Sequence, residues 1–252
     1  MLDLKTELSA LPERRGGPAG PPGHEHVRGW GVFGLPFESG HVLALRVFPE
    51  NDFAPYRTVW HRDPGGRWSI YVDGPRIDAA CPRYYGPACV HTAHAHLTLE
   101  WTGPASLRVQ MEDPVLDWAV TATQPAPLGA LNAVNRHLPD WTWKPGLLLE
   151  ARESLARRVL GLGDLRLSGV MPSGHHGVLM PKRMYWIETS TALLRGRDLG
   201  CPTHLDASPR IGDVTLPARG VLAVGQAVWR IRDREEYERM QRLTAPEVSP
   251  VD

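Results

Sequence analysis

The sequence predicts a mainly β fold, in which an antiparallel meander forms a closed or nearly closed barrel. Apolar and polar residues alternate along three short segments between Ala93 and Thr123, and this period of two is typical of strands with one buried face. Roughly ten such segments follow one another at short spacing, separated by turn-forming residues. Closure would remove the unpaired edges of so many apolar strands. A two-sheet sandwich would give a similar pattern, and we favour the barrel.

The chain is divided by composition into three parts. Near the N-terminus, three leucines lie three or four residues apart, as in a short amphipathic helix, and a stretch rich in Gly and Pro follows them. We therefore expect a flexible arm and linker, a single barrel-like domain and a disordered tail. Their bounds are residues 1–28, 29–243 and 244–252.

Two hairpins are expected at the start of the domain. The first places strands over residues 30–35 and 42–48 around the turn Glu38-Ser39-Gly40. The second places strands over residues 56–62 and 67–72 around Asp63-Pro64-Gly65-Gly66. Pro at the second position and Gly after it are favoured in tight turns, so the second signal is the stronger.

The meander between Ala93 and Thr123 has a predictable register. Its first two strands are joined through Thr102-Gly103-Pro104-Ala105, which pairs Trp101 with Leu107. This register places Glu100 opposite Arg108 and His96 opposite Glu112. The apolar rows then face one another, so the pairing is consistent with one buried face.

A pair of helices interrupts the strands in the middle of the chain. The first is expected to end before Pro139, and the second to begin near Pro145. Four apolar residues of the second helix share one side, which we expect to be buried: Leu148, Ala151, Leu155 and Val159.

Strands are expected again over residues 165–171, 178–189, 192–194 and 221–231. A charged helix follows, with Asp233 as its N-cap and its end near Leu243.

Composition excludes several classes of function. The 28 basic and 28 acidic residues cancel, and no basic–aromatic patch is visible, so nucleic acid is not an expected partner. No apolar run has the roughly 20 residues that a membrane span needs. Three cysteines without a Cys-x-x-Cys pair argue against a disulfide framework or a structural zinc site. We expect a cytoplasmic protein, and the sequence does not indicate its oligomeric state.

One group of residues has the spacing of metal ligands. His94 and His96 share a face if their segment is one strand, and two imidazoles so placed can bind one metal ion. Glu112 is then the expected third ligand, or orients His96. Two histidines on a solvated sheet surface are the alternative, and we favour it. No cofactor is otherwise expected, and a single divalent metal remains the exception.

The chain has nine tryptophans, and seven of them recur across the predicted strands. They can fill a solid core, or they can line a cavity with a few polar groups that holds a small apolar molecule. If a cavity exists, the residues expected to contact the ligand are the following: Trp60, Trp118, Tyr185, Trp186 and His175, the last from a Gly-flanked turn.

Several stretches, among them CPRYYG, PSGHHGVLMPKRMYWI and LPARGVLAVG, resemble an uncharacterised actinobacterial β-rich family, for which no activity is implied. The β-rich, Trp-rich pattern is also similar to that of calycin-type barrels, which include lipocalins and the carotenoid 1,2-hydratase group. Gly29-Trp30-Gly31 matches the early Gly-x-Trp signature of lipocalins only in part. No functional residue is transferred from either resemblance.

Three hypotheses about function follow. The first is the binding of a small apolar molecule, isoprenoid- or polyketide-like, with possible isomerase, hydratase or cyclase activity. The second is a metal-dependent hydrolase or lyase that uses His94, His96 and Glu112, in which the metal lowers the pKa of bound water. The third is a structural or interaction protein without a small-molecule site.

Overall fold

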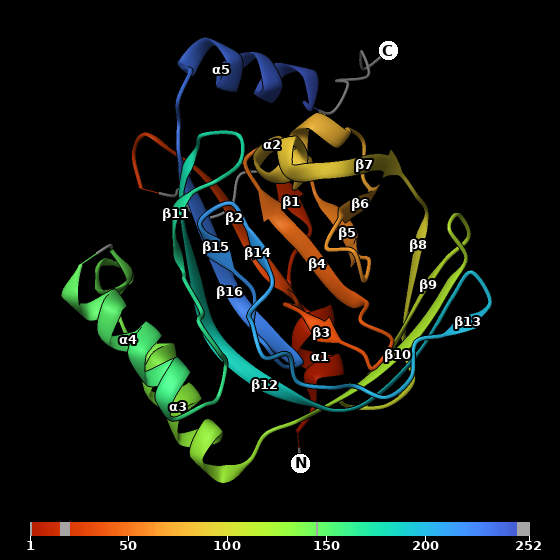
Figure 1. Cartoon of the computed structure of the whole chain (residues 1–252). Helices are drawn as coiled ribbons and strands as arrows, with labels where there is room; N and C mark the ends of the chain where they lie inside the picture. The colour runs from red at the N-terminus through yellow and green to blue at the C-terminus, as the bar shows by residue number, and fades with distance from the viewer. Residues whose placement is uncertain (1, 16–20, 145, 246–252) are drawn as a thin grey trace.

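The computed structural model describes residues 2–15, 21–144 and 146–245. Its main feature is one large curled sheet (Figure 1), as the mainly β prediction requires. From edge to edge, the sheet contains β7 (Cys89–His94), β6 (Trp68–Asp73), β5 (Tyr56–Arg62), β4 (Val42–Asn51), β2 (His24–Val32), β16 (Val221–Arg230), β12 (His176–Leu194), β10 (Leu116–Thr123), β9 (Ser106–Met111) and β8 (Leu97–Trp101).

Shorter elements flank this path. Four short strands pair with β4 or β12, and two more form a separate hairpin: β1 (Arg14–Arg15), β3 (Leu35–Pro36), β11 (Ser168–Val170), β13 (Arg197–Asp198), β14 (Arg210–Ile211) and β15 (Val214–Thr215). The helices are α1 (Leu4–Ser9), α2 (Pro82–Tyr85), α3 (Ala126–His137), α4 (Leu147–Arg158) and α5 (Arg234–Leu243), with 3-10 turns η1 (Ile77–Ala79), η2 (Gly86–Ala88) and η3 (Asp140–Trp143).

The sheet is an open half-barrel, so the prediction of a closed or nearly closed barrel is wrong. Its edge strands are β7 and β8, and no ladder joins them within the described residues. β7 pairs with β6 in parallel. After it, Ala95 and His96 lead the chain straight into β8, which continues from the end of β7 instead of returning beside it (Figure 1). A pure antiparallel meander is also contradicted, because β1 and β4 pair in parallel as well.

Glycines allow the sheet to bend sharply in its middle. A Cβ added at Gly29 in β2 would lie 1.9 Å from the Val47 carbonyl oxygen of β4, and one at Gly225 in β16 would lie 2.1 Å from that of Met180 in β12. Both sites adjoin a shift in strand register. Only glycine permits this approach of one backbone to the next. The curl of the sheet therefore depends on these two positions.

The predicted hairpins and the register of the meander are confirmed. β5 has the predicted bounds, and the Gly66 amide closes its turn by donating to the Asp63 carbonyl at 2.9 Å. Trp101 pairs with Leu107 and Glu100 with Arg108. The buried rows of β9 and β10 alternate with half-exposed residues, as the period of two requires.

Parts of the N-terminal segment pack on the sheet. Leu4 and Leu8 of α1 are buried against the sheet, and β2 begins at His24, within the residues that we assigned to the linker. The cause is hydrophobic: two leucines on one helical side cover apolar strand residues. Residues 16–20 of the expected linker and 246–252 of the expected tail lie outside the described residues. At the other end, Asp233 caps α5 as predicted, accepting a hydrogen bond from the Glu236 amide at 3.0 Å.

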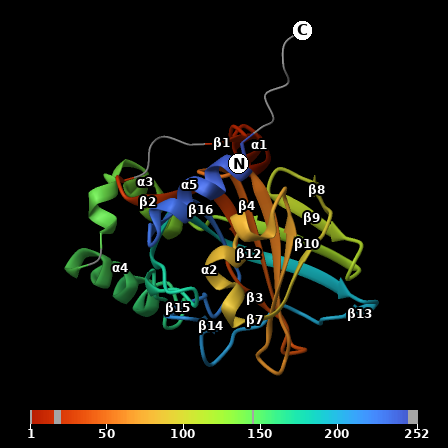
Figure 2. The same ribbon diagram turned by 90° about the horizontal axis from the view of Figure 1, so that it is seen from above.

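Three large apolar clusters, and a small fourth one around Phe53 and Met240, hold the fold together. The first, the α1 core, packs α1 and rows from most strands, including Trp118 and Tyr185. The second, the α2 core, lies on the opposite face of β4, β5 and β6, where η1, α2 and the β14–β15 hairpin cover Trp60 and Trp229. The third packs α3 and α4 on β12 and β16. Figure 2 shows α3 and α4 at one end of the molecule and β8, β9 and β10 at the other.

Candidate functional site

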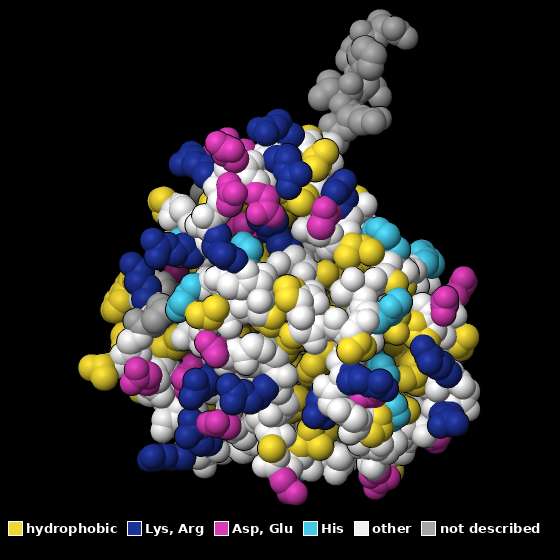
Figure 3. Space-filling view, turned by 45° about the horizontal axis from the view of Figure 1, so that its top comes forward, with side chains coloured by type: hydrophobic (Ala, Val, Ile, Leu, Met, Phe, Trp, Pro, Cys, Tyr) yellow, Lys and Arg dark blue, Asp and Glu magenta, His cyan; other side chains and the backbone are white. Residues whose placement is uncertain are grey.

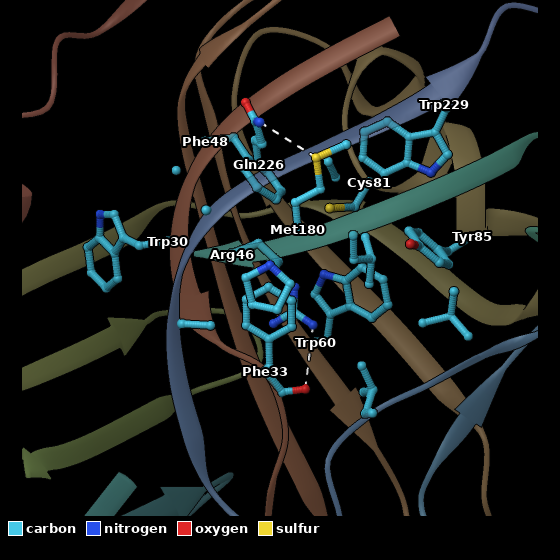
Figure 4. Close-up of a pocket in the computed structure, with 18 of the residues that line it drawn as sticks. Trp30, Phe33, Arg46, Phe48, Trp60, Cys81, Tyr85, Met180, Gln226 and Trp229 are labelled. Atoms are coloured by element: carbon cyan, nitrogen blue, oxygen red, sulfur yellow. Dashed lines mark hydrogen bonds between the residues drawn. The ribbon is translucent and has the colours of Figure 1, made fainter. Parts of the chain in front are cut away.

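The α2 core contains a small cavity of about 40 Å³. Its walls come from β2, β4, β5, β12 and β16 below, and from α2 and the β14–β15 hairpin above. The lining is almost wholly apolar and aromatic. The side chains that matter for its chemistry are Phe33, Arg46, Phe48, Trp60, Cys81, Tyr85, Gln226 and Trp229 (Figure 4).

Arg46 is the one charged residue of this lining. It follows Val42 and Ala44 in an alternating row of β4 that points into the α2 core, and Phe48 continues that row. Only 5% of Arg46 is exposed. Its guanidinium carbon lies 3.9 Å from the centre of the Phe33 ring and 5.3 Å from that of Trp60, and Figure 4 shows it beside these two rings. The cation is thus held by aromatic faces.

Among the described residues, Arg46 has no carboxylate partner. Its Nη1 donates to the carbonyls of Val32 at 2.7 Å and Leu45 at 3.0 Å, and its Nη2 donates to that of Phe33 at 3.5 Å. A guanidinium has five N–H donors, so these bonds leave donors free. Burial lowers the pKa of Arg46 to about 10, which still leaves it charged near neutral pH. A buried positive charge without a counter-ion is therefore the central feature of the cavity.

The other polar groups of the cavity are neutral. Burial raises the pKa of the Cys81 thiol and that of the Tyr85 hydroxyl. Gln226 reaches the cavity wall and donates to the Met180 sulfur at 3.5 Å. A thiol kept protonated is a poor nucleophile. The cavity thus offers one cation and apolar walls, with no activated nucleophile or base.

A polar groove of about 690 Å³ adjoins the cavity and shares Gly29, Gly225 and Gln226 with it. Four cationic side chains line the groove, against two acidic ones. They are Arg28, Arg136, Lys182 and Arg183, with Glu7 and Asp140. Asp140 forms an ion pair with Lys182 at 2.7 Å, and Glu7 forms one with Arg183. The excess of cations favours anions in this groove.

Of the five residues expected to line a ligand site, the structure places one in the cavity. Trp60 lies against Arg46. Trp118 and Tyr185 are buried in the α1 core, on the other face of the sheet. Trp186 is half-buried, with the Arg219 guanidinium 4.3 Å from its ring centre.

His175, the fifth, belongs to a separate buried polar cluster. Its Nδ1 lies 2.8 Å from the Ser173 hydroxyl and its Nε2 lies 3.9 Å from Glu25. Serine, histidine and glutamate suggest a catalytic triad, but Glu25 is fully engaged by other donors. Arg83 holds it in a bidentate ion pair and the Tyr84 hydroxyl donates to it at 2.5 Å. Ser173 lines neither the cavity nor the groove. We interpret this cluster as structural.

The three expected metal ligands are not brought together. His94 ends β7, whereas His96 lies in the connection that leads to β8, so the two histidines do not share one strand face as the alternation predicted. β9 ends at Met111, before Glu112. Within the described residues, no group of three or more potential ligands could hold a metal ion. The alternation of apolar and polar residues continues across Ala95 in the sequence, but β7 ends at His94 and β8 begins only at Leu97.

A histidine pair, with His41 directly before β4 and His61 in β5, gives a testable pH dependence. His41 Nδ1 and His61 Nε2 lie 2.7 Å apart, and burial, with the neighbouring His41, lowers the pKa of His61 to about 4 from 6.5. Between these values the unfolded chain binds the proton and the folded chain does not. The free energy of unfolding should therefore fall as the pH drops from 6.5 towards 4. Urea titrations at several pH values in this range measure the effect. In His61→Gln the free energy of unfolding should depend less steeply on pH than in the wild type. An equally steep dependence would contradict the role of His61.

Sequence reasoning missed Arg46, Phe33 and Gln226. The signal for Arg46 is visible: within the strand predicted over residues 42–48, one arginine interrupts the row of Val42, Ala44 and Phe48. A charge in an otherwise apolar row is expensive to bury, so such a residue often has a specific role.

Comparisons with known proteins found no matching family model, no matching curated protein and no matching solved structure. The resemblances to the actinobacterial family and to calycins therefore stay predictions. Among the described helices, none is long and apolar enough to cross a membrane.

Proposed function

We propose that this protein binds a short apolar monocarboxylate, with the carboxylate on Arg46 and the aliphatic part against the surrounding aromatic rings. The observation that carries this proposal is the buried Arg46 guanidinium, which faces a cavity and has free donors but no acidic partner among the described residues. A carboxylate is the natural complement, because the guanidinium fork matches its two oxygens.

Electrostatics favours an anionic ligand over a neutral one. Burying an unpaired cation is unfavourable, since the low-dielectric interior stabilises it much less than water does. A bound anion would offset that cost. At short range, the attraction between the guanidinium and an anion is stronger in the low-dielectric interior than in water.

The size of the cavity limits the ligand. An engineered cavity of about 150 Å³ accepts benzene, whereas this one has about 40 Å³. An isoprenoid or polyketide chain does not fit such a space. Butyrate and isobutyrate have as many non-hydrogen atoms as benzene, so they fit only if flexible side chains of the lining, such as Met180 and Gln226, move outward on binding. The sequence suggested a small apolar ligand of unspecified size. We now propose short monocarboxylates, and the compounds to test are propionate, butyrate and isobutyrate.

The chemistry of the walls favours binding over catalysis. The Cys81 thiol, which lies 3.5 Å from the Tyr56 hydroxyl oxygen, has a raised pKa, and no carboxylate lines the cavity that could act as a base. A carrier or sensor of small carboxylates fits these groups better than an isomerase or hydratase does.

Quenching of tryptophan emission tests the proposal. Isobutyrate should change the emission with saturation at one site per chain, because Trp60 and Trp229 line the cavity. Isobutyramide, which has a similar shape without the charge, should bind at least about tenfold more weakly, since charge-assisted hydrogen bonds are roughly twice as strong as neutral ones. Equal affinities for acid and amide, or saturation by neither, would contradict the proposal.

A further inference from the structure

The helix α4 exposes its apolar side. We expected Leu148, Ala151, Leu155 and Val159 to be buried, and the structure contradicts this: Leu148 is 53% and Val159 69% exposed. The residues that α4 buries are Leu149 and Ala156, on a different side. Four residues spaced by three or four positions thus form an apolar row, the α4 row, that faces solvent.

The α4 row belongs to a larger apolar surface. Trp141 of η3 is 62% exposed and Leu147 at the start of α4 is 84% exposed. Six of the eleven large hydrophobic residues that are exposed among the described residues fall between positions 134 and 159. Soluble proteins rarely group exposed apolar residues in this way unless the surface binds something.

Cations lie beside the α4 row, and the two acidic residues of α4 are turned away from it. Asp140, which precedes Trp141 in η3, is paired with Lys182. Arg158 follows Leu155 by three residues and Arg152 follows Leu148 by four, so they border the α4 row on its two sides. Glu150 and Glu153 lie on the far side of the helix, and Glu153 accepts a 2.7 Å hydrogen bond from the Leu167 amide.

Several of the cations near this surface are free to pair. Among the described residues, no carboxylate lies within ion-pair distance of Arg136, Lys144 or Arg158. Figure 3 shows hydrophobic, basic and some acidic side chains next to one another on the left flank, which corresponds to the place of α4 in Figure 1. An apolar stripe flanked by arginines, with an exposed tryptophan beside it, is typical of helices that lie in a membrane interface.

We propose that α4 and η3 dock on the surface of a membrane that contains anionic lipids. The α4 row and Trp141 would enter the boundary between head groups and acyl chains, and Lys144 and Arg158 would contact lipid phosphates. The helix would lie on the bilayer and would not cross it.

Charge argues against a second copy of this chain as the occupant. Pairing two α4 rows would place the bordering arginines of one copy near those of the other, with no acidic residue on either border to compensate. An anionic lipid surface satisfies the same cations, so it is the better complement.

Sedimentation with lipid vesicles tests the proposal on the full chain. The protein should sediment with vesicles that contain phosphatidylglycerol, and much less with vesicles of phosphatidylcholine alone, and added salt should release it. Leu148→Glu should lower the partition coefficient at least about tenfold, because it removes a leucine that would enter the membrane and adds a negative charge.

Val115→Glu is the matched control, since Val115 is 60% exposed in the turn between β9 and β10, and it should leave vesicle binding unchanged. Quenching of emission by brominated lipids should be reduced in Trp141→Phe. Failure of the wild-type chain to sediment with either vesicle would overturn the proposal, as would equal loss in both glutamate variants. A dimer in analytical ultracentrifugation that Leu155→Glu dissociates, without vesicle binding, would assign the surface to a second copy instead.

Discussion

Replacing Arg46 with methionine should strongly weaken the binding of short carboxylates while the protein stays folded. The variant keeps a long side chain between Phe33 and Trp60 but removes the charge. We expect the affinity for isobutyrate to fall by about 10- to 100-fold, the effect of one or two charge-assisted hydrogen bonds. The affinity for isobutyramide should fall much less in this variant. Fluorescence titration of both ligands against both proteins measures the difference.

Stability is the second readout of Arg46→Met. Removing a buried, unpaired cation is favourable, whereas the carbonyls of Val32 and Leu45 lose their donor. These effects oppose each other, so the free energy of unfolding should change by less than about 2 kcal/mol. Arg57→Met on the neighbouring strand, where the side chain is 39% exposed, removes the same net charge and should leave carboxylate binding intact. If Arg46→Met unfolds and the wild-type protein binds no carboxylate, the proposal is wrong. The role of Arg46 would then be structural, through its hydrogen bonds to the connection between β2 and β3.

Periodicity predicted the strands well where a segment buries one face. β10 shows this: Leu116, Trp118 and Val120 are buried, and the residues between them are half-exposed. Local turn chemistry was equally informative, because the turn from Asp63 to Gly66 depends only on its own residues.

Closure of the barrel could not be predicted from such patterns. The centre of the sheet pairs β2 with β16, which lie about two hundred residues apart in sequence, and alternation within a strand says nothing about its partner. The break at Ala95 and His96 also leaves the alternation intact. The pattern therefore reports the faces of each strand, but it does not report where pairing stops.

The site was only partly predictable for a related reason. Trp60 was identified because tryptophans in strands suggest either a core or a cavity. Arg46 became meaningful only when η1, α2 and the β14–β15 hairpin, which belong to distant parts of the chain, covered its face of the sheet. Without that cover, an arginine in a strand is an ordinary surface residue.

The largest stability effect is expected at Glu25. This carboxylate is 1% exposed, and it accepts two hydrogen bonds from Arg83, at 2.7 and 2.9 Å, and one from the Tyr84 hydroxyl at 2.5 Å. Glu25→Ala would leave the Arg83 cation, whose side chain is 5% exposed, without its buried partner. Breaking a buried pair in this way costs about 3–5 kcal/mol, and the midpoint of urea unfolding should fall accordingly.

Glu236→Ala is the matched control, because Glu236 pairs with the same Arg83 from the surface at 2.9 Å and is 42% exposed. It should cost no more than about 1 kcal/mol. Glu25→Leu combined with Arg83→Met should recover most of the loss, since an apolar pair avoids the cost of burying charge. If the double variant is no more stable than Glu25→Ala, the cost of buried charge is not what the cluster relieves. The hydrogen bond from Tyr84 to Glu25 would then be the interaction that holds α2 in place, since Tyr84 also stacks on Trp229 with ring centres 3.8 Å apart.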